Sequence, residues 1–260
     1  MVPQVSLITV CFNDLSGLEL TLEAVSACDF ENLEHIVVDG GSSDGTPEYL
    51  DTYDRHRITW LSERDNGIYD AMNKGAQLAK GNYLIFLNAG DKIFPEALKE
   101  LVELDCTLID CMVCSLTIVR GDGLSYLFEP KMPQVNELPV WGMPFGHMGM
   151  VISRELFLTI GGYSTKFRVS ADYEFVLRMT KEKINFKKTE ITLGIFFVGG
   201  VSGGLRTVKE NFTILRAYNV PIITALMSCA RVIIFRSLGQ FLPIQWVRWL
   251  QKIRSILKNL

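Results

Sequence analysis

The sequence predicts an α/β protein with a mainly parallel sheet flanked by helices, and three observations support this prediction. Four apolar runs rich in β-branched residues alternate with segments of helical periodicity between residues 5 and 91. Each run stops at a polar turn, and the 260 residues are 48% hydrophobic, enough for a sizeable core. Because such alternation is the pattern of βαβ units, right-handed crossovers should bring the ends of the strands to one edge of the sheet.

The four runs define the predicted strands, and the segments between them carry helix signals. We expect strands at Val5–Phe12, His35–Asp39, Ile58–Ser62 and Tyr83–Leu87. The intervening helices are indicated by the spacing of Leu18, Leu22 and Val25, by Pro47–Tyr53, and by the apolar face Ile68, Ala71, Met72, Gly75 and Leu78, which stops before Gly81.

Acidic and amide side chains stand where each predicted strand ends. The turns are Asn13–Asp14, Asp39–Gly41, Asp65–Asn66 and Asn88–Asp91. Each acid alone is as consistent with a helix cap as with a ligand site. Together they repel one another unless a cation or a hydrogen-bonding ligand lies among them, which favours a nucleotide and metal site. The chain has neither a G-x-G-x-x-G fingerprint after the first strand nor a Walker lysine loop.

Four ordered blocks of sequence resemble those of family-2 glycosyltransferases. The blocks are Val5–Asn13, Ile36–Thr46, Ser62–Gly75 and Gly81–Asp91. The resemblance implies the GT-A fold, a mixed but mainly parallel sheet, and a nucleotide-sugar donor. The Asp-Asn-Gly-Ile-Tyr-Asp-Ala-Met-Asn form of the third block most resembles enzymes of bacterial exopolysaccharide and colanic-acid-type assembly.

The same resemblance assigns residues to the donor site. It implies that Asp39 contacts the nucleotide base, that Asp65 helps to hold the nucleotide, and that Asn13 closes the donor-binding first block. Asp91 corresponds to the terminal acid of the family's metal-binding Asp-x-Asp, so the expected cofactor is Mg²⁺ or Mn²⁺. Asn88–Asp91 keeps one carboxylate where many relatives have two or three. One acid can suffice, because Mg²⁺ is often held by one or two carboxylates plus substrate phosphates.

The middle of the chain gives weaker patterns. We expect a helix over Leu98–Leu104, two strands at Cys111–Val119 and Leu124–Phe128, and a proline-rich loop over 129–146. A strand is then expected at His147–Ser153, followed by a short helix over Glu155–Ile160.

The candidate catalytic base is Asp172, which precedes the helical run Tyr173–Thr180. The resemblance continues at Gly161–Tyr163 and Ser170–Glu174, and it implies that Asp172 deprotonates the acceptor hydroxyl of an inverting transfer. A helix N-terminus would keep this carboxylate ionised. A plain N-cap is the alternative for Asp172, and Glu174 is the second choice as base.

Several other residues have two interpretations each. His147 either binds acceptor or metal or is structural, and Trp141 either stacks on a sugar or packs. The glycine-dense Gly199–Arg206 suits a mobile flap over a diphosphate, with Arg206 and Lys209 neutralising the leaving UDP or GDP. A flexible linker is the alternative for this segment.

Charge is divided unevenly along the chain. Residues 1–110 hold 20 Asp and Glu against 7 Lys and Arg, which excludes a general nucleic-acid footprint, whereas residues 211–260 hold 7 Lys and Arg and no acid. Trp246–Leu260 has cationic amphipathic spacing, which favours peripheral contact with the inner membrane. The alternatives are packing on the catalytic domain or a homodimer through the C-terminal helices. Arg231 and Arg236 interrupt the apolar stretch before it, so no transmembrane span is expected.

The redox and targeting signals indicate the cytoplasm. The N-terminus lacks the basic start of a signal peptide. Six scattered cysteines include one cluster, Cys106, Cys111 and Cys114, without a nearby His. We therefore expect reduced, mostly buried thiols rather than a zinc site, in a protein at the cytoplasmic face of the membrane.

Together these features predict a hexosyltransferase-type enzyme of bacterial surface polysaccharide synthesis. A GT-A domain over 1–206 would comprise a nucleotide-sugar-binding half (1–98) and an acceptor and catalytic half (99–206), followed by a helical tail (207–260). A UDP- or GDP-sugar would donate to a saccharide or polyprenyl-diphosphate-linked acceptor. Two alternatives are a polyprenyl-phosphate glycosyltransferase and a non-catalytic, membrane-associated subunit that binds nucleotide sugar.

Overall fold

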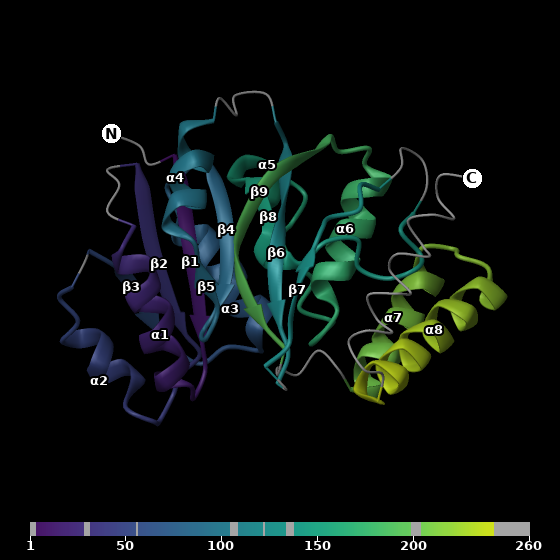
Figure 1. Ribbon diagram of the computed structural model, residues 1–260, viewed down its shortest axis with the longest axis horizontal. Helices are drawn as coiled ribbons and strands as arrows, with labels where there is room; N and C mark the ends of the chain where they lie inside the picture. The colour runs from purple at the N-terminus through teal and green to yellow at the C-terminus, as the bar shows by residue number, and fades with distance from the viewer. Residues whose placement is uncertain are drawn as a thin grey trace. The chain divides into compact units, whose positions relative to one another are not determined.

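Figure 1 shows the chain as a computed structural model, which describes residues 4–28, 32–55, 57–104, 109–121, 123–133, 138–198 and 204–241. The chain forms two compact units. The first comprises Met1–Pro139 and Met143–Gly199, and the second comprises Val140–Gly142 and Gly200–Leu260.

Within the described residues, nine strands form one sheet of order β3-β2-β1-β4-β8-β6-β9-β5, with β7 paired to β6. The first four strands are parallel, as predicted: β1 (Val5–Cys11), β2 (Leu33–Asp39), β3 (Thr59–Ser62) and β4 (Tyr83–Asn88). Since β1 pairs with both β2 and β4, their C-terminal ends meet at one edge. The predicted α/β fold with a mixed sheet is confirmed.

The second half of the sheet is where the strand directions mix. Its strands are β5 (Lys92–Ile93), β6 (Cys111–Val119), β7 (Ser125–Phe128), β8 (Met150–Ser153) and β9 (Phe186–Phe197). β8 is antiparallel to both β4 and β6, whereas β9 is parallel to β6 and antiparallel to β5. The long strand β9 was not predicted, and its pairing with β5 carries it to the turn that follows β4.

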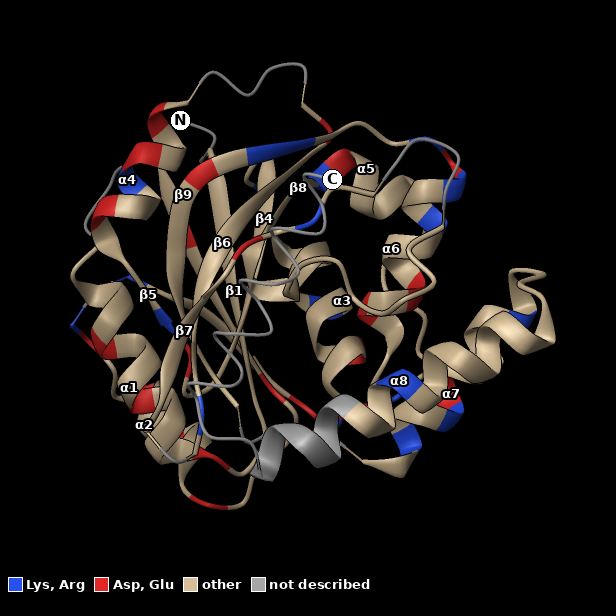
Figure 2. Cartoon of the chain, turned by 45° about the vertical axis from the view of Figure 1, so that its right-hand side comes forward, with Lys and Arg blue, Asp and Glu red and all other residues tan. Residues whose placement is uncertain are grey.

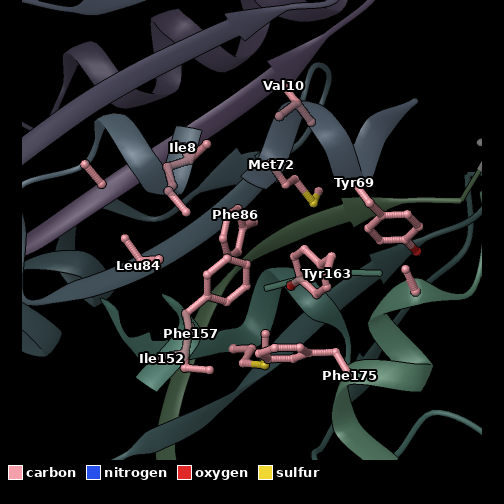
Figure 3. Packing of buried hydrophobic residues seen from close by; sticks show 14 of the residues in the cluster. Ile8, Val10, Tyr69, Met72, Leu84, Phe86, Ile152, Phe157, Tyr163 and Phe175 are labelled. Carbon is pink, nitrogen blue, oxygen red and sulfur yellow. The ribbon is translucent and has the colours of Figure 1, made fainter. Parts of the chain in front are cut away.

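Six helices of the first unit cover the two faces of the sheet. They are α1 (Leu15–Ser26), α2 (Thr46–Asp51), α3 (Ile68–Leu78), α4 (Pro95–Glu103), α5 (Arg154–Thr159) and α6 (Ala171–Lys181). Ile8 and Val10 of β1 pack towards α3, α5 and α6, in the cluster that Figure 3 shows. Val5 and Leu7, which alternate with them, pack against α1 and α4 on the other face.

Gly75 brings α3 unusually close to the sheet. A Cβ atom built on Gly75 would lie 2.4 Å from Cγ2 of Ile8, so any other residue would require a shift of the helix or of the Ile8 side chain. The close approach fixes the lateral position of α3, whose first turn lies at the strand-end edge.

Two sequence predictions in this unit need correction. His147–Gly149 is not the start of a strand but a 3-10 turn (η1), closed by a 3.0 Å hydrogen bond from Gly149 N to Gly146 O. Gly149 lies so close to Cys114 O that a Cβ would be 2.6 Å from it, and β8 begins only after this contact. Helix α6 starts at Ala171 because Glu174 N already donates to Ser170 O, so Asp172 lies in its first turn rather than before it.

The second unit contains α7 (Leu205–Ala217) and α8 (Ile222–Phe241), which pack against each other. Ala225, Ser228 and Cys229 of α8 are buried, and Ser228 Oγ donates to Val140 O. The opposite side of α8 is an exposed apolar stripe, which comprises Ile222, Ile223, Leu226, Met227, Ile233 and Ile234. None of the described helices is long and apolar enough to cross a membrane. The amphipathic segment predicted at 246–260 lies outside the described residues.

The described cysteines agree with the predicted reduced state. Cys11, Cys28, Cys111, Cys114 and Cys229 are all buried and free. Burial raises the pKa of the Cys11 thiol to about 11. Cys106 lies outside the described residues.

Candidate active site

Two of the four predicted strand-end turns are joined by hydrogen bonds, and a third packs closely against them. Asn13, which has a φ of 50°, donates from its backbone N to Ser42 Oγ (2.7 Å). Its side-chain Oδ1 accepts from Ser43 N (2.9 Å). The turn after β1 is thereby bound to the turn after β2, and Asn13 itself stays exposed to solvent.

Asp39, the last residue of β2, is fully buried, and the protein itself occupies both of its carboxylate oxygens. Oδ2 accepts from Gly41 N (3.2 Å), Ser42 N (3.0 Å) and Ser62 Oγ (2.6 Å). Oδ1 accepts from Ser42 Oγ. Asp39 therefore orders the turn after β2 and joins it to β3. Because the carboxylate is fully buried, a nucleotide base could reach it only after a local rearrangement of this turn.

Asp65 lies directly against the turn after β2. One of its oxygens, Oδ1, accepts from Gly67 N (2.8 Å), which closes the loop before α3. The other, Oδ2, would be only 2.5 Å from a Cβ on Gly40, so glycine is needed there for the two loops to meet. Lys74 of α3 binds the same loop: its Nζ donates to Arg64 O (2.9 Å) and forms an ion pair with Glu63 Oε1 (2.7 Å).

Phe12 is a further candidate for ligand contact, which its sequence pattern did not predict. It follows β1 and is 61% exposed, and its ring edge borders Gly40. A bulky apolar ring left in solvent beside Asn13 and Asp65 is suited to stacking on a planar ligand. Its exposure could not be inferred from its place in an apolar run.

Asp91 is nearly buried, with 3% of its surface exposed. Its Oδ2 accepts from Asn88 N (3.0 Å) and closes its own turn, while its backbone O accepts from Thr21 Oγ1 of α1 (2.8 Å). Burial raises the pKa of Asp91 to about 7, against the opposing effect of backbone hydrogen bonds from Asn88 and Phe197. Asp91 thus ties the turn to the end of β9 and to α1.

The side chain of Asn88 has an oxygen without a partner. Oδ1 of Asn88 is buried and accepts no hydrogen bond from any described group, and Nδ2 lies 3.3 Å from His147 Nε2. Burial lowers the pKa of His147, while the charge of Asp172 acts in the opposite direction. A neutral imidazole and an amide therefore stand together at the end of β4.

These residues fit a divalent cation through Asn88 better than through Asp91. Amide oxygens are accepted ligands of hard cations, and donor phosphates supply much of the coordination of Mg²⁺. The Asp91 carboxylate is nearly buried and accepts hydrogen bonds from the backbone of Asn88 and Phe197. Among the described residues, no group of three or more His, Cys, Asp or Glu could hold a metal. The assignment of Asp91 as a metal ligand stays a prediction.

Asp172 lies in the first turn of α6 and is partly exposed. Its Oδ1 accepts from Tyr173 N (2.8 Å) and from the hydroxyl of Tyr69 (2.9 Å), the second residue of α3. No described residue donates to Oδ2. The structure thus links the candidate base to the helix that begins just after Asp65.

Glu174, the second choice as base, forms an ion pair with Arg178. Its Oε2 lies 2.7 Å from Nη2 of Arg178. Its Oε1 accepts a hydrogen bond from Nε of the same arginine at 3.3 Å. The same guanidinium donates to the carbonyls of Ile160 (2.5 Å) and Gly162 (2.8 Å). Glu174 therefore holds Arg178 against the turn before Tyr163, which is a structural role.

The remaining predicted residues lie in the second unit. Trp141 is 48% exposed, and the Arg231 guanidinium lies 6.0 Å from its ring centre. Arg206 begins α7 with its side chain 60% exposed, 4.0 Å from Glu210. Lys209 is exposed on the same helix. Most of the flap predicted at Gly199–Arg206 lies outside the described residues, so the donor role of Arg206 stays a prediction.

The mixed sheet, whose parallel half ends in this polar, carboxylate-bearing edge, has the fold of GT-A glycosyltransferases. The chain belongs to glycosyl transferase family 2: the family model matches residues 6–174. The protein is therefore a glycosyltransferase.

Two glycosyltransferases are similar to this chain over about two thirds of its length. An uncharacterized glycosyltransferase of Mycobacterium tuberculosis is 35% identical over 179 residues, which cover 68% of each chain. A PGL/p-HBAD biosynthesis glycosyltransferase of Mycobacterium bovis is 28% identical over 196 residues, covering 68% of this chain and 69% of the relative.

Solved structures share the fold at low sequence identity. S. aureus TarS 1–349 in complex with UDP-GlcNAc matches with a TM-score of 0.63 and 15% identity, over 91% of this chain and 73% of that one. The match to another TarS structure covers 43% of that chain. The Pyrobaculum calidifontis mannosyltransferase PcManGT, in complex with GDP-Man and Mn²⁺, matches with a TM-score of 0.61 and 17% identity, over 98% and 81%.

Proposed function

We propose that this glycosyltransferase inverts the anomeric centre of a nucleoside-diphosphate sugar, with Asp172 as the catalytic base. The observation that carries the proposal is the placement of the Asp172 carboxylate. Tyr69 and Tyr173 hold one of its oxygens, and the other is left to accept a proton. The acceptor hydroxyl would lose its proton to Oδ2 as its oxygen bonds to the anomeric carbon. The bond from that carbon to the diphosphate breaks on the opposite face, and the nucleoside diphosphate leaves.

The donor would lie along the edge formed by Phe12, Asn13, Asp39 and Asp65. The three polar residues belong to loops that bind one another, and Phe12 offers an exposed ring for the base. UDP-GlcNAc and GDP-Man, bound in structures of the same fold, support a UDP- or GDP-sugar. Arg206 would neutralise the leaving diphosphate.

A divalent cation, Mg²⁺ or Mn²⁺, would act with the donor. When bound, it would neutralise charge on the leaving diphosphate. The Asn88 oxygen without a partner supports a ligand at the end of β4, and Asp91 would hold the shape of that turn. The Mn²⁺ in the PcManGT complex supports this choice of cofactor.

The acceptor would be a lipid-linked saccharide of bacterial surface polysaccharide synthesis, reached from the cytoplasmic face of the membrane. The exposed apolar stripe of α8 supports this proposal, because the apolar face of an amphipathic helix is stabilised by contact with another apolar surface, such as lipid. In Figure 2 the Lys and Arg positions on α7 and α8 are coloured blue, and residues 211–260 contain no acid. Anionic lipid would complement these charges, whereas a second copy of the unit would repel them.

The experiment compares the wild-type enzyme with Asp172→Asn. A panel of nucleotide sugars is first screened by calorimetry with Mg²⁺, and transfer is then measured with the bound donor and lipid-linked saccharides. The variant is expected to bind donor normally and to lose transfer by about a thousandfold, within the range for general base removal. Full turnover by the variant would refute the role of Asp172.

Two product measurements test the finer claims. The anomeric configuration, read by NMR, must be opposite to that of the donor if transfer inverts. An assay with bare polyprenyl phosphate separates the alternative acceptor, which needs no strong base. Faster transfer to that phosphate than to any lipid-linked saccharide would replace the proposed acceptor.

A further inference from the structure

The side chains of Tyr69 and Asp172 meet although 103 residues separate them in the sequence. Tyr69 is the second residue of α3, and Asp172 is the second residue of α6. The Tyr69 hydroxyl donates to Asp172 Oδ1 at 2.9 Å. We propose that Tyr69 is a positioning residue that holds the catalytic carboxylate of Asp172 in its working orientation.

The environment of Tyr69 suits a permanent donor. Only 8% of its surface is exposed, and its ring lies 5.3 Å from that of Tyr163, centre to centre. Burial and the nearby Asp172 carboxylate raise the pKa of Tyr69 well above its usual value, so the hydroxyl keeps its proton. The Tyr69 hydroxyl therefore remains a hydrogen-bond donor to Asp172 at neutral pH.

The bond also selects which carboxylate oxygen reacts. Tyr69 and the Tyr173 amide both bind Oδ1, and no described residue binds Oδ2. With two donors on one oxygen, the carboxylate cannot rotate freely about its last torsion. Oδ2 is then presented in one orientation, which geometric alignment with a substrate hydroxyl requires.

Tyr69 further connects the base to the donor loop. Gly67, two residues earlier, donates its N–H to Asp65 Oδ1, and Asp70 accepts from Asn66 N. The stretch from Asp65 to Tyr69 therefore contacts the proposed donor site at one end and the proposed base at the other. The inference rests on the proposed function of Asp172, and its test must separate the two.

Tyr163 provides a matched control for the test. Its hydroxyl is also buried in the same aromatic cluster, which Figure 3 shows, but it has no hydrogen-bond partner among the described groups. Tyr163→Phe removes the same atom as Tyr69→Phe and breaks no such bond. Any general effect of removing a tyrosine hydroxyl from this cluster would appear in both variants.

The experiment measures kcat, the donor KM and the pH dependence of kcat for the wild type, Y69F and Y163F. Y69F is expected to lower kcat about tenfold or more with little change in the donor KM, as befits a hydrogen bond to a charged group. Because such a bond favours the charged form of the carboxylate, the acidic limb of the profile should move to higher pH. Y163F should change kcat less than about twofold and leave the profile in place.

Two further measurements make the outcome decisive. Donor binding by calorimetry and the unfolding temperature check that Y69F is folded. A folded Y69F with the kcat and pH profile of the wild type, or with the same loss as Y163F, overturns the positioning role. Asp172→Asn is assayed alongside. An inactive D172N supports the role of Asp172 as the base whatever the result for Y69F, whereas an active D172N overturns the proposed function itself.

Discussion

Asn73 and Tyr163 form two hydrogen bonds with each other across 90 residues of sequence. Asn73 Nδ2 donates to Tyr163 O (2.8 Å), and Tyr163 N donates to Asn73 Oδ1 (2.9 Å). The Asn73 side chain, on α3, thus pairs with the backbone of Tyr163 as a neighbouring strand would. Gly161 and Gly162, which precede Tyr163, both have positive φ. This pairing fixes the turn that precedes α6, and with it the approach of Asp172 to Tyr69.

Asn73→Ala should destabilise the fold. The variant leaves the N–H and C=O of Tyr163 without their partner, at a cost of about 2 kcal/mol. For a protein of this size, that lowers the unfolding temperature by about 4–8 °C. Calorimetric scans check this value, with the exposed Asn185→Ala as the control. An N73A melt equal to that of N185A would contradict the structural role.

Phe12→Ala should weaken donor binding. Stacking of a base on an aromatic ring contributes about 1–3 kcal/mol, so the Kd for the nucleoside diphosphate should rise about tenfold. Titration calorimetry measures it. Leu127→Ala removes another exposed apolar side chain, from β7, and should leave the Kd unchanged. Equal affinities for F12A and the wild type would place the base elsewhere.

Asn88→Ala should raise the concentration of Mg²⁺ or Mn²⁺ needed for half-maximal transfer, because it removes the buried oxygen without a partner. Asp91→Asn keeps the size of a side chain that closes its turn and should alter this concentration less. Metal titrations at saturating donor compare the two variants. The reverse ranking would make Asp91 the ligand, as the sequence resemblance implies.

Asp91 should also make stability depend on pH. Its pKa rises from 3.8 to about 7 on folding, so the native state binds the proton more tightly than the unfolded chain. Its contribution to stability is therefore largest below pH 3.8 and is lost as the pH rises to about 7. Unfolding temperatures in a chelator should fall more steeply across this window for the wild type than for Asp91→Asn. Parallel curves would exclude this titration.

Substitutions in the apolar stripe of α8 should weaken binding to anionic vesicles. Ile223 is 70% exposed, and replacing it with Glu removes apolar contact and adds a charge that anionic lipid repels. Cosedimentation should show at least about tenfold weaker binding, with donor affinity unchanged. Light scattering runs beside it: a wild-type dimer that I223E breaks would assign the stripe to a second copy instead.

Much of the first half of the fold could be predicted because its signals are local. Val5–Cys11 and Tyr83–Leu87 are continuous apolar runs, and each is followed directly by a polar turn. Parallel pairing then requires the turns to meet, as Asn13 and Ser42 do. The long strand β9 escaped prediction because Lys187, Lys188 and Glu190 interrupt it. Only Thr189, Ile191, Leu193 and Gly194 of its twelve residues are buried, and its register with β6 shifts twice.

The orientation of the site's side chains could not be predicted. The strand-end acids Asp65 and Asp91 look alike in sequence, yet one oxygen of Asp65 faces Gly40 while Asp91 turns inward to Asn88 N. The difference comes from contacts with α1 and β9, which are remote in sequence. The bond from Tyr69 to Asp172 depends in the same way on the aromatic contacts of Tyr163, which link Tyr69 of α3 to Phe175 of α6. Local patterns locate a residue at an edge, and tertiary contacts decide which way it points.

The close approach of Gly75 to Ile8 has a consequence for attempts to engineer this enzyme. One rigid helix, seated by that contact, carries both the loop of Asp65 and the hydroxyl of Tyr69. Under the proposed function, a larger side chain at position 75 that displaces α3 would disturb the donor contacts and the base together. Libraries that seek a new sugar should hold residues 65–75 constant and vary the turns after β1 and β2.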